Sequence, residues 1–275
     1  MTHSRPTIRD LLDSNSLAPR RDLGQNFVAD PNTVRRIADL ARVGPGDHVV
    51  EIGAGLGSLT LALADTGADI TAIEVDRGVV PVLRDVVADR SNVTVVEADA
   101  MQLDWSAVLD PDVPGGWVLV ANLPYNVATP LICDILDGVA QVSRLIVMVQ
   151  REAAERFAAS PGTSAYGAVS VKAAYWGSAR IVGHVPASVF VPRPNVESAL
   201  VEITRADPPP TDPVELFSLV RTGFGQRRKM LRRSLSGVVS SETFVAADVA
   251  PTARPEELDV AAWCRLTDAH LASGE

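Results

Sequence analysis

Short apolar runs alternate with helical patterns over the first two hundred residues of the chain. The runs have the length and composition of buried strands, and they lie at residues 49–52, 69–74, 93–96, 117–121 and 145–149. The segments between them favour helices, and residues 180–203 favour two further strands. Strands that alternate with helices predict an α/β domain built on a mostly parallel sheet.

Two helices are predicted before the first long strand. Residues 1–20 contain an amphipathic helix that carries Ile8, Leu11 and Leu12 on one side. Asp30 and Pro31 have the types typical of an N-cap and a first helical position, and apolar residues follow at helical spacing. Between these helices, residues 23–28 mix amides, a glycine and an aromatic ring. This segment is interpreted either as a plain turn or as a lid over a neighbouring site.

A change in composition after residue 206 indicates a domain boundary. The stretch from Asp207 to Pro213 contains four prolines and has the composition of a linker. Residues 214–275 favour helices only. We therefore expect an N-terminal domain at 1–206 and a small, all-helical C-terminal domain at 207–275.

Composition narrows the class of protein. Hydrophobic residues make up 47% of the 275 residues, which is enough for a sizeable core, and the net charge is −9. No apolar run reaches the roughly 18 residues of a spanning helix, and the N-terminus has no signal-type apolar region. Cys133 and Cys264 lack metal-ligand spacing. We expect a cytoplasmic protein with reduced thiols, no metal and no membrane association.

The first long strand runs directly into a glycine-rich turn. Residues 49–60 read VVEIGAGLGSLT, with Gly53, Gly55 and Gly57 spaced by two. Such a turn lets a ligand approach the backbone closely. A pyrophosphate-binding turn needs a further glycine where Ser58 stands, and the Glu51 carboxylate would repel a pyrophosphate. The turn therefore favours S-adenosylmethionine, a cationic ligand, over NAD, and a glycine loop without a ligand is the plain alternative.

Two acids lie at or just after the carboxyl ends of the next two strands, at the edge of the sheet where ligands collect. Glu74 ends the 69–74 strand, where an acid accepts hydrogen bonds from both ribose hydroxyls of a nucleotide. A solvated acid at a strand end is the alternative. Asp99 follows the 93–96 strand, and it could accept a hydrogen bond from an adenine amino group.

The segment Asn122-Leu123-Pro124-Tyr125 carries the most specific chemistry. A side-chain amide oxygen and a backbone carbonyl can accept the two hydrogens of an exocyclic base amine, and proline fixes the direction of the carbonyl. The ring of Tyr125 can stack on a flipped base. Phe190 could stack from the other side, with plain packing as the alternative for that ring.

A basic stretch stands out in the acidic chain. Residues 224–235 contain five basic residues and no acid: Arg227, Arg228, Lys229, Arg232 and Arg233. An amphipathic helix would pair Arg228 with Arg232 and Lys229 with Arg233. The local contrast favours a surface that binds RNA phosphates, and a solvated helix face is the alternative.

These motifs together resemble the small-subunit (16S) ribosomal RNA adenine N6,N6-dimethyltransferases, the kasugamycin-sensitivity methyltransferases of bacteria. The resemblance covers about residues 22–235 and rests on GQNF, EIGAGLGSLT, Glu74, EADA, NLPY, QRE, FVPRPNVES and FGQRRK, in that order. It implies a class I S-adenosylmethionine-dependent methyltransferase fold: a Rossmann-like seven-stranded sheet with an antiparallel last strand, plus the small helical domain. The 23S rRNA resistance methyltransferases share many of these motifs, but the last three are closer to the small-subunit branch.

The resemblance also implies a substrate and a set of site residues. The substrate would be two adjacent adenosines in the 3′-terminal hairpin loop of 16S rRNA, within the pre-30S or 30S small ribosomal subunit, each dimethylated at N6. A monomer is expected. The donor-binding residues implied are Asn26, Val28, Gly53, Gly55, Glu74, Asp99 and Asn122; the target-base residues are Asn122, Leu123, Pro124, Tyr125 and Phe190. Val28 departs from the leucine that is more frequent in the family.

Two other classes of function remain open from the residues alone. A dehydrogenase on a Rossmann sheet is disfavoured by Ser58, by the NLPY segment and by the basic C-terminal stretch. A non-catalytic ribosome-assembly factor could have kept the fold, although an intact NLPY segment favours catalysis. Both roles could also exist in one protein.

Overall fold

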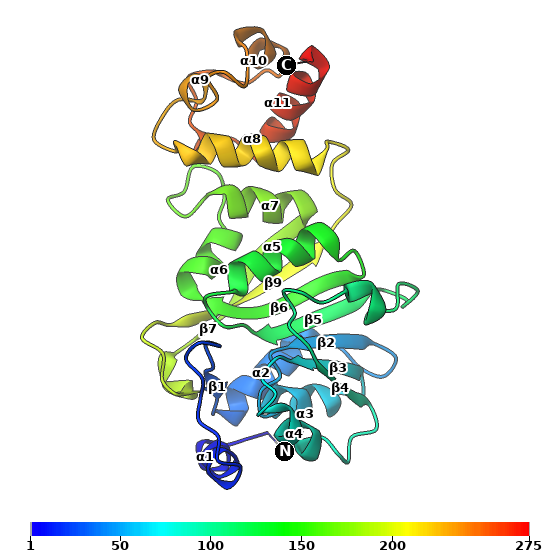
Figure 1. The fold of residues 1–275 in the computed structure, drawn as a ribbon. Coiled ribbons are helices and arrows are strands. Elements are labelled where there is room, and N and C mark those ends of the chain that lie inside the picture. The colour runs from blue at the N-terminus through cyan, green and yellow to red at the C-terminus, as the bar shows by residue number, and fades with distance from the viewer. Residues whose placement is uncertain (1, 275) are drawn as a thin grey trace. The chain divides into compact units, whose positions relative to one another are not determined.

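The computed structural model describes residues 2–274 and divides the chain into two compact units (Figure 1). The first unit contains the chain up to Ala154 together with Arg180–Arg205, and the second contains Glu155–Ala179 and Ala206–Glu275. The segment 155–179 packs with the C-terminal helices because Tyr166, Val171 and Tyr175 belong to their core. The compact units therefore differ in this segment from the boundary expected at residue 206.

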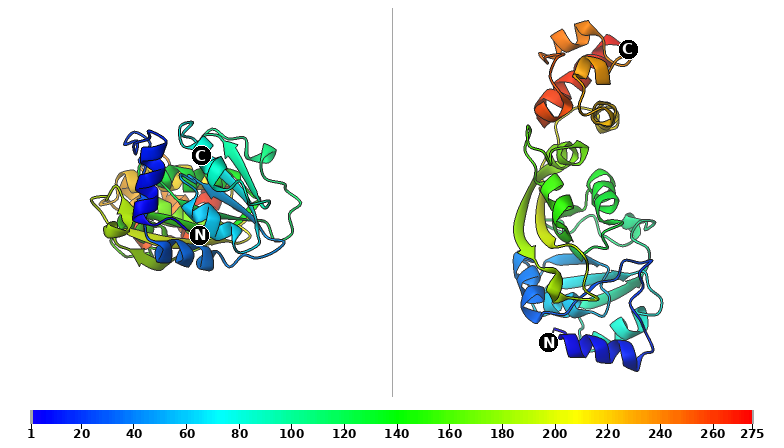
Figure 2. Two further views of the ribbon diagram at one scale, coloured as in Figure 1. Left: turned by 90° about the horizontal axis from the view of Figure 1, so that it is seen from below. Right: turned by 90° about the vertical axis from the view of Figure 1, so that its left-hand side faces the viewer.

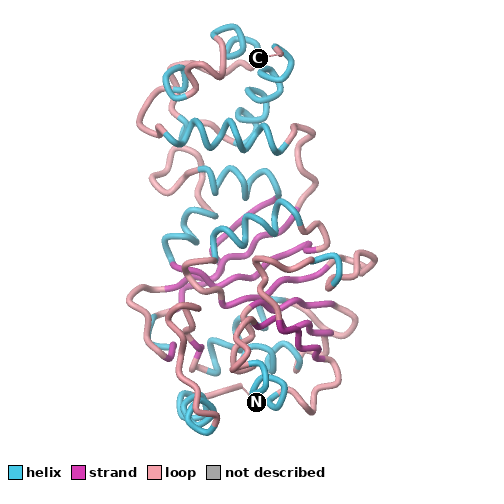
Figure 3. Tube along the Cα trace, viewed as in Figure 1, coloured by secondary structure: helices cyan, strands magenta, loops and turns pink. Residues whose placement is uncertain are grey.

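The first unit is built on a seven-stranded sheet, which Figure 3 shows in magenta. The strand order is β4-β3-β2-β5-β6-β9-β7, and β9 runs antiparallel to β6. The remaining pairs of registered strands, from β4 to β6, are parallel. The predicted class I methyltransferase architecture is thus confirmed. The strands are β2 (His48–Ile52), β3 (Asp69–Glu74), β4 (Val93–Glu97), β5 (Trp117–Asn122), β6 (Val142–Gln150), β7 (Gly177–Val185) and β9 (Ser198–Arg205).

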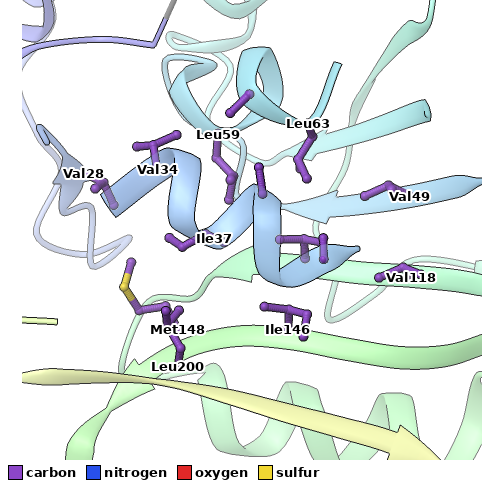
Figure 4. Close-up of a cluster of buried hydrophobic side chains, with 14 of the residues drawn as sticks. Val28, Val34, Ile37, Val49, Leu59, Leu63, Val118, Ile146, Met148 and Leu200 are labelled. Carbon is purple, nitrogen blue, oxygen red and sulfur yellow. The ribbon is translucent and has the colours of Figure 1, made fainter. Parts of the chain in front are cut away.

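Helices cover both faces of this sheet. Figure 4 shows α2 and α3 against one face, where Val118, Ile146 and Met148 meet the helix residues Ile37 and Leu59. Alternate strand residues point the other way, toward the face that α5 covers (Figure 2). The helices before and between the strands are α1 (Arg5–Ser14), α2 (Pro31–Ala41), α3 (Ser58–Ala64), α4 (Val80–Val86), α5 (Ala128–Gly138) and α6 (Arg151–Phe157). Two short 3₁₀ helices are η1 (Trp105–Ala107) and η2 (Ala187–Val189).

The predicted start of α2 is confirmed. The side chain of Asp30 accepts a hydrogen bond from the Thr33 amide at 3.0 Å, and Pro31 is the first helical residue. Immediately before this helix, β1 (Phe27–Val28) pairs with β8 (Phe190–Val191) in a separate two-stranded sheet. The GQNF segment is therefore tied to the loop that carries the FVPRPNVES motif.

The second unit is helical and has its own core. Trp263 and Phe244 are fully buried there, and Tyr166 donates a hydrogen bond to the Leu258 carbonyl at 2.9 Å. Its elements are α7 (Ala168–Trp176), α8 (Pro213–Gly225), α9 (Leu231–Ser234), α10 (Ser241–Ala246), η3 (Pro255–Glu257) and α11 (Val260–Ser273).

The prediction of one amphipathic helix through the basic stretch is wrong. Helix α8 ends at Gly225, Gln226 leaves helical geometry at φ −128° and ψ 46°, and turns follow. Met230 is extended and is the N-cap of the four-residue helix α9. The expected rows of Arg228 with Arg232 and of Lys229 with Arg233 therefore do not exist, because glycine is a weak helix former and the chain turns there.

Candidate active site

The glycine turn joins β2 to α3 and is held against the end of β3. The amides of Gly53 and Ala54 donate to the Ile73 carbonyl at 2.9 and 3.2 Å. Gly55 has φ +57°, and a Cβ built there would lie 3.1 Å from the ring of Phe27. A side chain at this position would therefore be strained and crowded, which explains the glycine.

Glu74 is the acid that organises the turn. One carboxylate oxygen accepts from the Gly55 amide at 2.8 Å, and the other accepts from the amides of Val75 and Asp76 at 3.0 and 2.9 Å. Burial raises the pKa of Glu74, while these three amide hydrogen bonds lower it and so oppose the effect of burial. The acid therefore supports the glycine turn as well as facing the cavity described next.

A cavity of about 100 Å³ lies over the glycine turn. It is lined by six of the seven residues predicted to bind the donor, namely Asn26, Val28, Gly53, Gly55, Glu74 and Asn122. Asp99 lines a second cavity of about 180 Å³. Both cavities share the lining residues Leu23, Gly53, Val75, Leu123 and Pro124. The structure thus places the predicted donor residues along two adjoining cavities at the carboxyl edge of the parallel strands.

Glu51 is a cavity residue that the predicted site set omits. Its side chain is almost fully buried, it lines the cavity over the glycine turn, and its Oε2 atom has no hydrogen-bond partner among the described residues. Burial raises the pKa of Glu51 to about 8, and the nearby Glu74 carboxyl adds to this rise. An unpartnered buried carboxyl is costly unless a ligand meets it, so this group fits a cationic ligand.

His3 is a second omitted residue, and nothing in the local sequence signals it. It is buried, lines the same cavity, and makes two contacts with the end of the glycine turn. Its amide donates to Ser58 Oγ at 3.1 Å, and its Nε2 lies 2.8 Å from the Leu56 carbonyl, to which it can only donate. The N-terminal segment therefore forms part of the cavity wall.

The NLPY segment directly follows β5, as predicted. The side-chain nitrogen of Asn122 donates to the main-chain carbonyl of Asn26 at 2.9 Å. A carbonyl can only accept, so this contact fixes the orientation of the Asn122 amide and leaves Oδ1 as its acceptor. The carbonyl of Pro124 accepts from the amides of Val127 and Ala128 at the start of α5. The Leu123 carbonyl, next to the proline, is therefore the backbone acceptor that remains for a substrate.

The two aromatic residues of the target-base set differ in their surroundings. Tyr125 is half-buried, lines the cavity and forms a 2.7 Å hydrogen bond with Ser198 Oγ. Phe190 is fully buried in the core with Val28, Val34 and Met148. Its position here matches the packing alternative, and the stacking role of Phe190 stays a prediction.

The five basic residues of the second unit also differ from one another. Arg227 donates to the Thr163 carbonyl at 3.3 Å and lies 3.8 Å from the Glu256 carboxylate. Arg228, Lys229, Arg232 and Arg233 are exposed. Arg227 therefore also has partners within its own unit, and the RNA-binding role of all five side chains stays a prediction.

Two further findings concern classes of site. Within residues 2–274, no group of three or more His, Cys, Asp or Glu side chains could hold a metal ion. Across the same residues, none of the helices has both the length and the apolar character needed to cross a membrane.

Comparison with known families gives an independent result. The family model described as "Ribosomal RNA adenine dimethylase" matches residues 17–270. The chain belongs to this family. The "Ribosomal RNA small subunit methyltransferase A" of Cutibacterium acnes is 43% identical over 98% of this chain and 94% of that protein. The protein of the same name from Acidothermus cellulolyticus is 44% identical over 95% of this chain and 92% of its own length.

Two solved structures of methyl-transferring enzymes share the fold of this dimethylase-family chain. A dimethyladenosine transferase from Plasmodium falciparum aligns with a TM-score of 0.73 at 23% identity, over 86% of this chain and 94% of that chain. The 23S rRNA methyltransferase ErmE aligns with a TM-score of 0.67 at 25% identity, over 88% of this chain and 98% of that chain.

Proposed function

We propose that this protein transfers methyl groups from S-adenosylmethionine to the N6 atoms of adenosines in small-subunit ribosomal RNA. Membership of the adenine dimethylase family supports the reaction type. The observation that carries the proposal is the fixed Asn122 amide, which faces the same cavity as the glycine turn and Glu74. A methyl donor and a target amine can therefore meet at one place.

The residues fit a cationic, phosphate-free donor. Glu51 and Glu74 both contribute carboxyl groups to the cavity, and Glu51 has an oxygen without a hydrogen-bond partner within residues 2–274. A sulfonium or ammonium group favours the ionised form of these carboxyl groups and is attracted to it, whereas a pyrophosphate would disfavour that form. When bound, S-adenosylmethionine supplies an electrophilic methyl group. Asp99 and Glu74 would hold its adenine and ribose, in line with their positions at adjacent strand ends.

The chain's own residues prepare the target amine. The lone pair of an adenine amino group is delocalised into the ring, so the amine is a poor nucleophile. Asn122 Oδ1 and the Leu123 carbonyl would each accept one amine hydrogen and draw the nitrogen toward tetrahedral geometry. The ring of Tyr125 would stack on the extruded base. A side-chain general base is not required, because the methylated amine can release its proton after transfer.

The finer identity of the substrate is part of the proposal. The substrate is a pair of adjacent adenosines in the 3′-terminal hairpin loop of 16S rRNA, in a pre-30S or 30S subunit, each dimethylated by a monomeric enzyme in the cytoplasm. The strong identity to small subunit methyltransferases supports this substrate over 23S rRNA. The exposed basic residues of the C-terminal helical domain would bind RNA phosphates, and the protein would contribute to 30S biogenesis.

The test uses the intact protein with unmethylated small subunits and isotopically labelled S-adenosylmethionine. Mass spectrometry of RNA fragments maps the labelled bases. We expect two neighbouring N6,N6-dimethyladenosines in the 3′-terminal hairpin of 16S rRNA and no label in large subunits. Label elsewhere, or binding without label, would contradict the proposal.

A further inference from the structure

The GQNF segment spans the distance between the loop after β3 and the NLPY segment. Gly24, at φ +64°, lies so close to NLPY that a Cβ there would be 3.0 Å from Pro124 Cβ and from Asn126 Oδ1. The Gly24 carbonyl also accepts from the Asn26 side chain at 2.9 Å. Asn26 in turn presents its main-chain carbonyl to Asn122. The position of this segment therefore decides where the Asn122 amide points.

Gln25 fastens the other side of the same segment. Its Nε2 atom donates to Asp76 Oδ2 at 2.8 Å, and its Oε1 atom accepts from the Arg20 amide at 2.9 Å. The Gln25 amide also donates to the Arg20 carbonyl at 3.1 Å. Both ends of the Gln25 side chain are therefore used, which is a strict geometric requirement on one residue.

Asp76 connects the Gln25 side chain to the donor cavity. It is 6% exposed, its amide donates to Glu74 Oε1 at 2.9 Å, and its Oδ1 accepts from the Gly78 amide at 2.9 Å. Each oxygen of the Asp76 carboxylate thus has a donor. A hydrogen-bonded route runs from Glu74 through Asp76 and Gln25 to the segment that holds Asn122.

We propose that Gln25 is a positioning residue that couples the Glu74 side of the donor cavity to the Asn122 amide. The inference rests on the proposed function, because it assigns a purpose to the orientation of Asn122. Gln25 acts through Asp76 on one side and through the Asn26 carbonyl on the other. With the segment held, Asn122 Oδ1 keeps its direction toward the target amine. With the segment loose, the Asn122 amide turns away, while the cavity walls built by β2, β3 and the glycine turn stay in place.

The key variant is Gln25→Glu, which sets a carboxylate against the Asp76 carboxylate. We expect kcat for adenosine methylation to fall about tenfold to a hundredfold, the scale of a misplacement near 1 Å in a site. The Kd for small subunits should stay within about twofold. The Kd for S-adenosylhomocysteine should change much less than kcat, because β2, β3 and the glycine turn keep their places and only the part of the cavity wall at residues 23–28 loosens. Gln25→Met, which removes both hydrogen bonds without a charge, should show the same split if the first variant folds poorly.

A compensating substitution provides a second readout. In the protein that carries both Gln25→Glu and Asp76→Asn, the amide nitrogen introduced at 76 can donate to the acid introduced at 25. The Gly78 and Arg20 amides would keep their acceptors, so kcat should recover. Gln141→Glu, the same change just before β6 and at the opposite end of the strands from these loops, controls for added charge and should leave kcat unchanged.

The possible outcomes distinguish a failure of the role assigned to Gln25 from a failure of the proposed function. Unchanged kcat in both Gln25 variants, in an active parent protein, would overturn the inference alone. A loss of kcat accompanied by a similar fold loss of donor affinity and by a lower melting temperature would also overturn it, because Gln25 would then be a general structural residue. A parent protein that binds S-adenosylhomocysteine but never methylates small subunits would overturn the proposed function, and this inference with it.

Discussion

The hydroxyl of Tyr125 forms a 2.7 Å hydrogen bond with Ser198 Oγ, across 73 residues of sequence. Ser198 is fully buried at the start of β9 and is the last residue of the FVPRPNVES motif. The contact ties the hydroxyl end of the tyrosine ring to the antiparallel strand. The ring that would stack on the target base is therefore held by a motif that is distant in sequence.

Tyr125→Phe should keep the ring but lose this hydrogen bond. We expect the free energy of unfolding to fall by about 1 kcal/mol, because Ser198 Oγ is left buried without a partner. The methylation rate should fall only severalfold. Tyr125→Leu removes the stacking face and should reduce the rate far more, measured in single-turnover assays with small subunits. Equal rates for the two variants would show that the ring does not contact the base.

Asn122→Ala should impair turnover more than small-subunit binding. Losing one preorganised polar contact in a site costs about 10²–10³ in kcat. Asn32→Ala is a matched control, since Asn32 is an exposed amide on α2 whose Oδ1 accepts a hydrogen bond from Arg35. Both variants are assayed for kcat and for small-subunit binding. A parent-like kcat in Asn122→Ala would show that Asn122 does not act on the target amine.

Glu74→Ala should weaken donor binding for two reasons. The ribose hydroxyls lose a charged acceptor, worth roughly 1.5–3 kcal/mol per hydrogen bond, and the Gly55 amide loses the partner that holds the turn. Calorimetry with S-adenosylhomocysteine measures the change. A folded variant with parent-like affinity would exclude Glu74 as a donor residue.

Glu51 should make stability depend on pH. Its folded-state pKa of about 8 lies above the usual value of 4.5, so the folded state holds the proton more tightly. Stability from this group is present below about pH 4.5 to 5 and is lost as the pH rises toward 8, at no more than about 1.4 kcal/mol per pH unit. The raised pKa of Glu74 acts in the same direction.

Urea unfolding of Glu51→Gln isolates this contribution. The free energy of unfolding of the variant should decline less steeply than that of the parent between pH 5 and 8. Glu97→Gln, an exposed acid at the end of β4, should keep the parent slope. Parallel curves for the parent and Glu51→Gln would show that Glu51 is ionised in the folded protein at neutral pH.

Arg232 and Arg233 should contribute to RNA binding through phosphates. Changing both to glutamine should weaken small-subunit binding and lower the slope of log affinity against log salt by about 2. Donor affinity should not change, because the donor cavity lies within the first unit. Arg227→Gln should instead reduce stability, since Arg227 contacts Thr163 and Glu256. An unchanged salt slope in the double variant would exclude this surface as the docking site.

The sequence by itself determined the sheet, the glycine turn and the strand-end chemistry. Apolar runs and capping residues such as Asp30 act locally, so their consequences are readable without tertiary contacts. The glycine spacing and NLPY were readable for the same reason, because each is a short backbone geometry. The positions of Glu74, Asp99 and Asn122 followed from strand ends, since parallel strands bring those ends to one edge.

Only the tertiary structure decided which side chains meet across long separations. His3 against Leu56, Gln25 against Asp76, and Tyr125 against Ser198 are set by loop paths that carry no periodic signal. The burial of Phe190 and the unpartnered oxygen of Glu51 depend on what packs around them from other elements. The position of α9 after the break at Gly225 follows the same logic, because the amides of Leu231 and Arg232 donate to the distant carbonyls of Ala253 and Pro251.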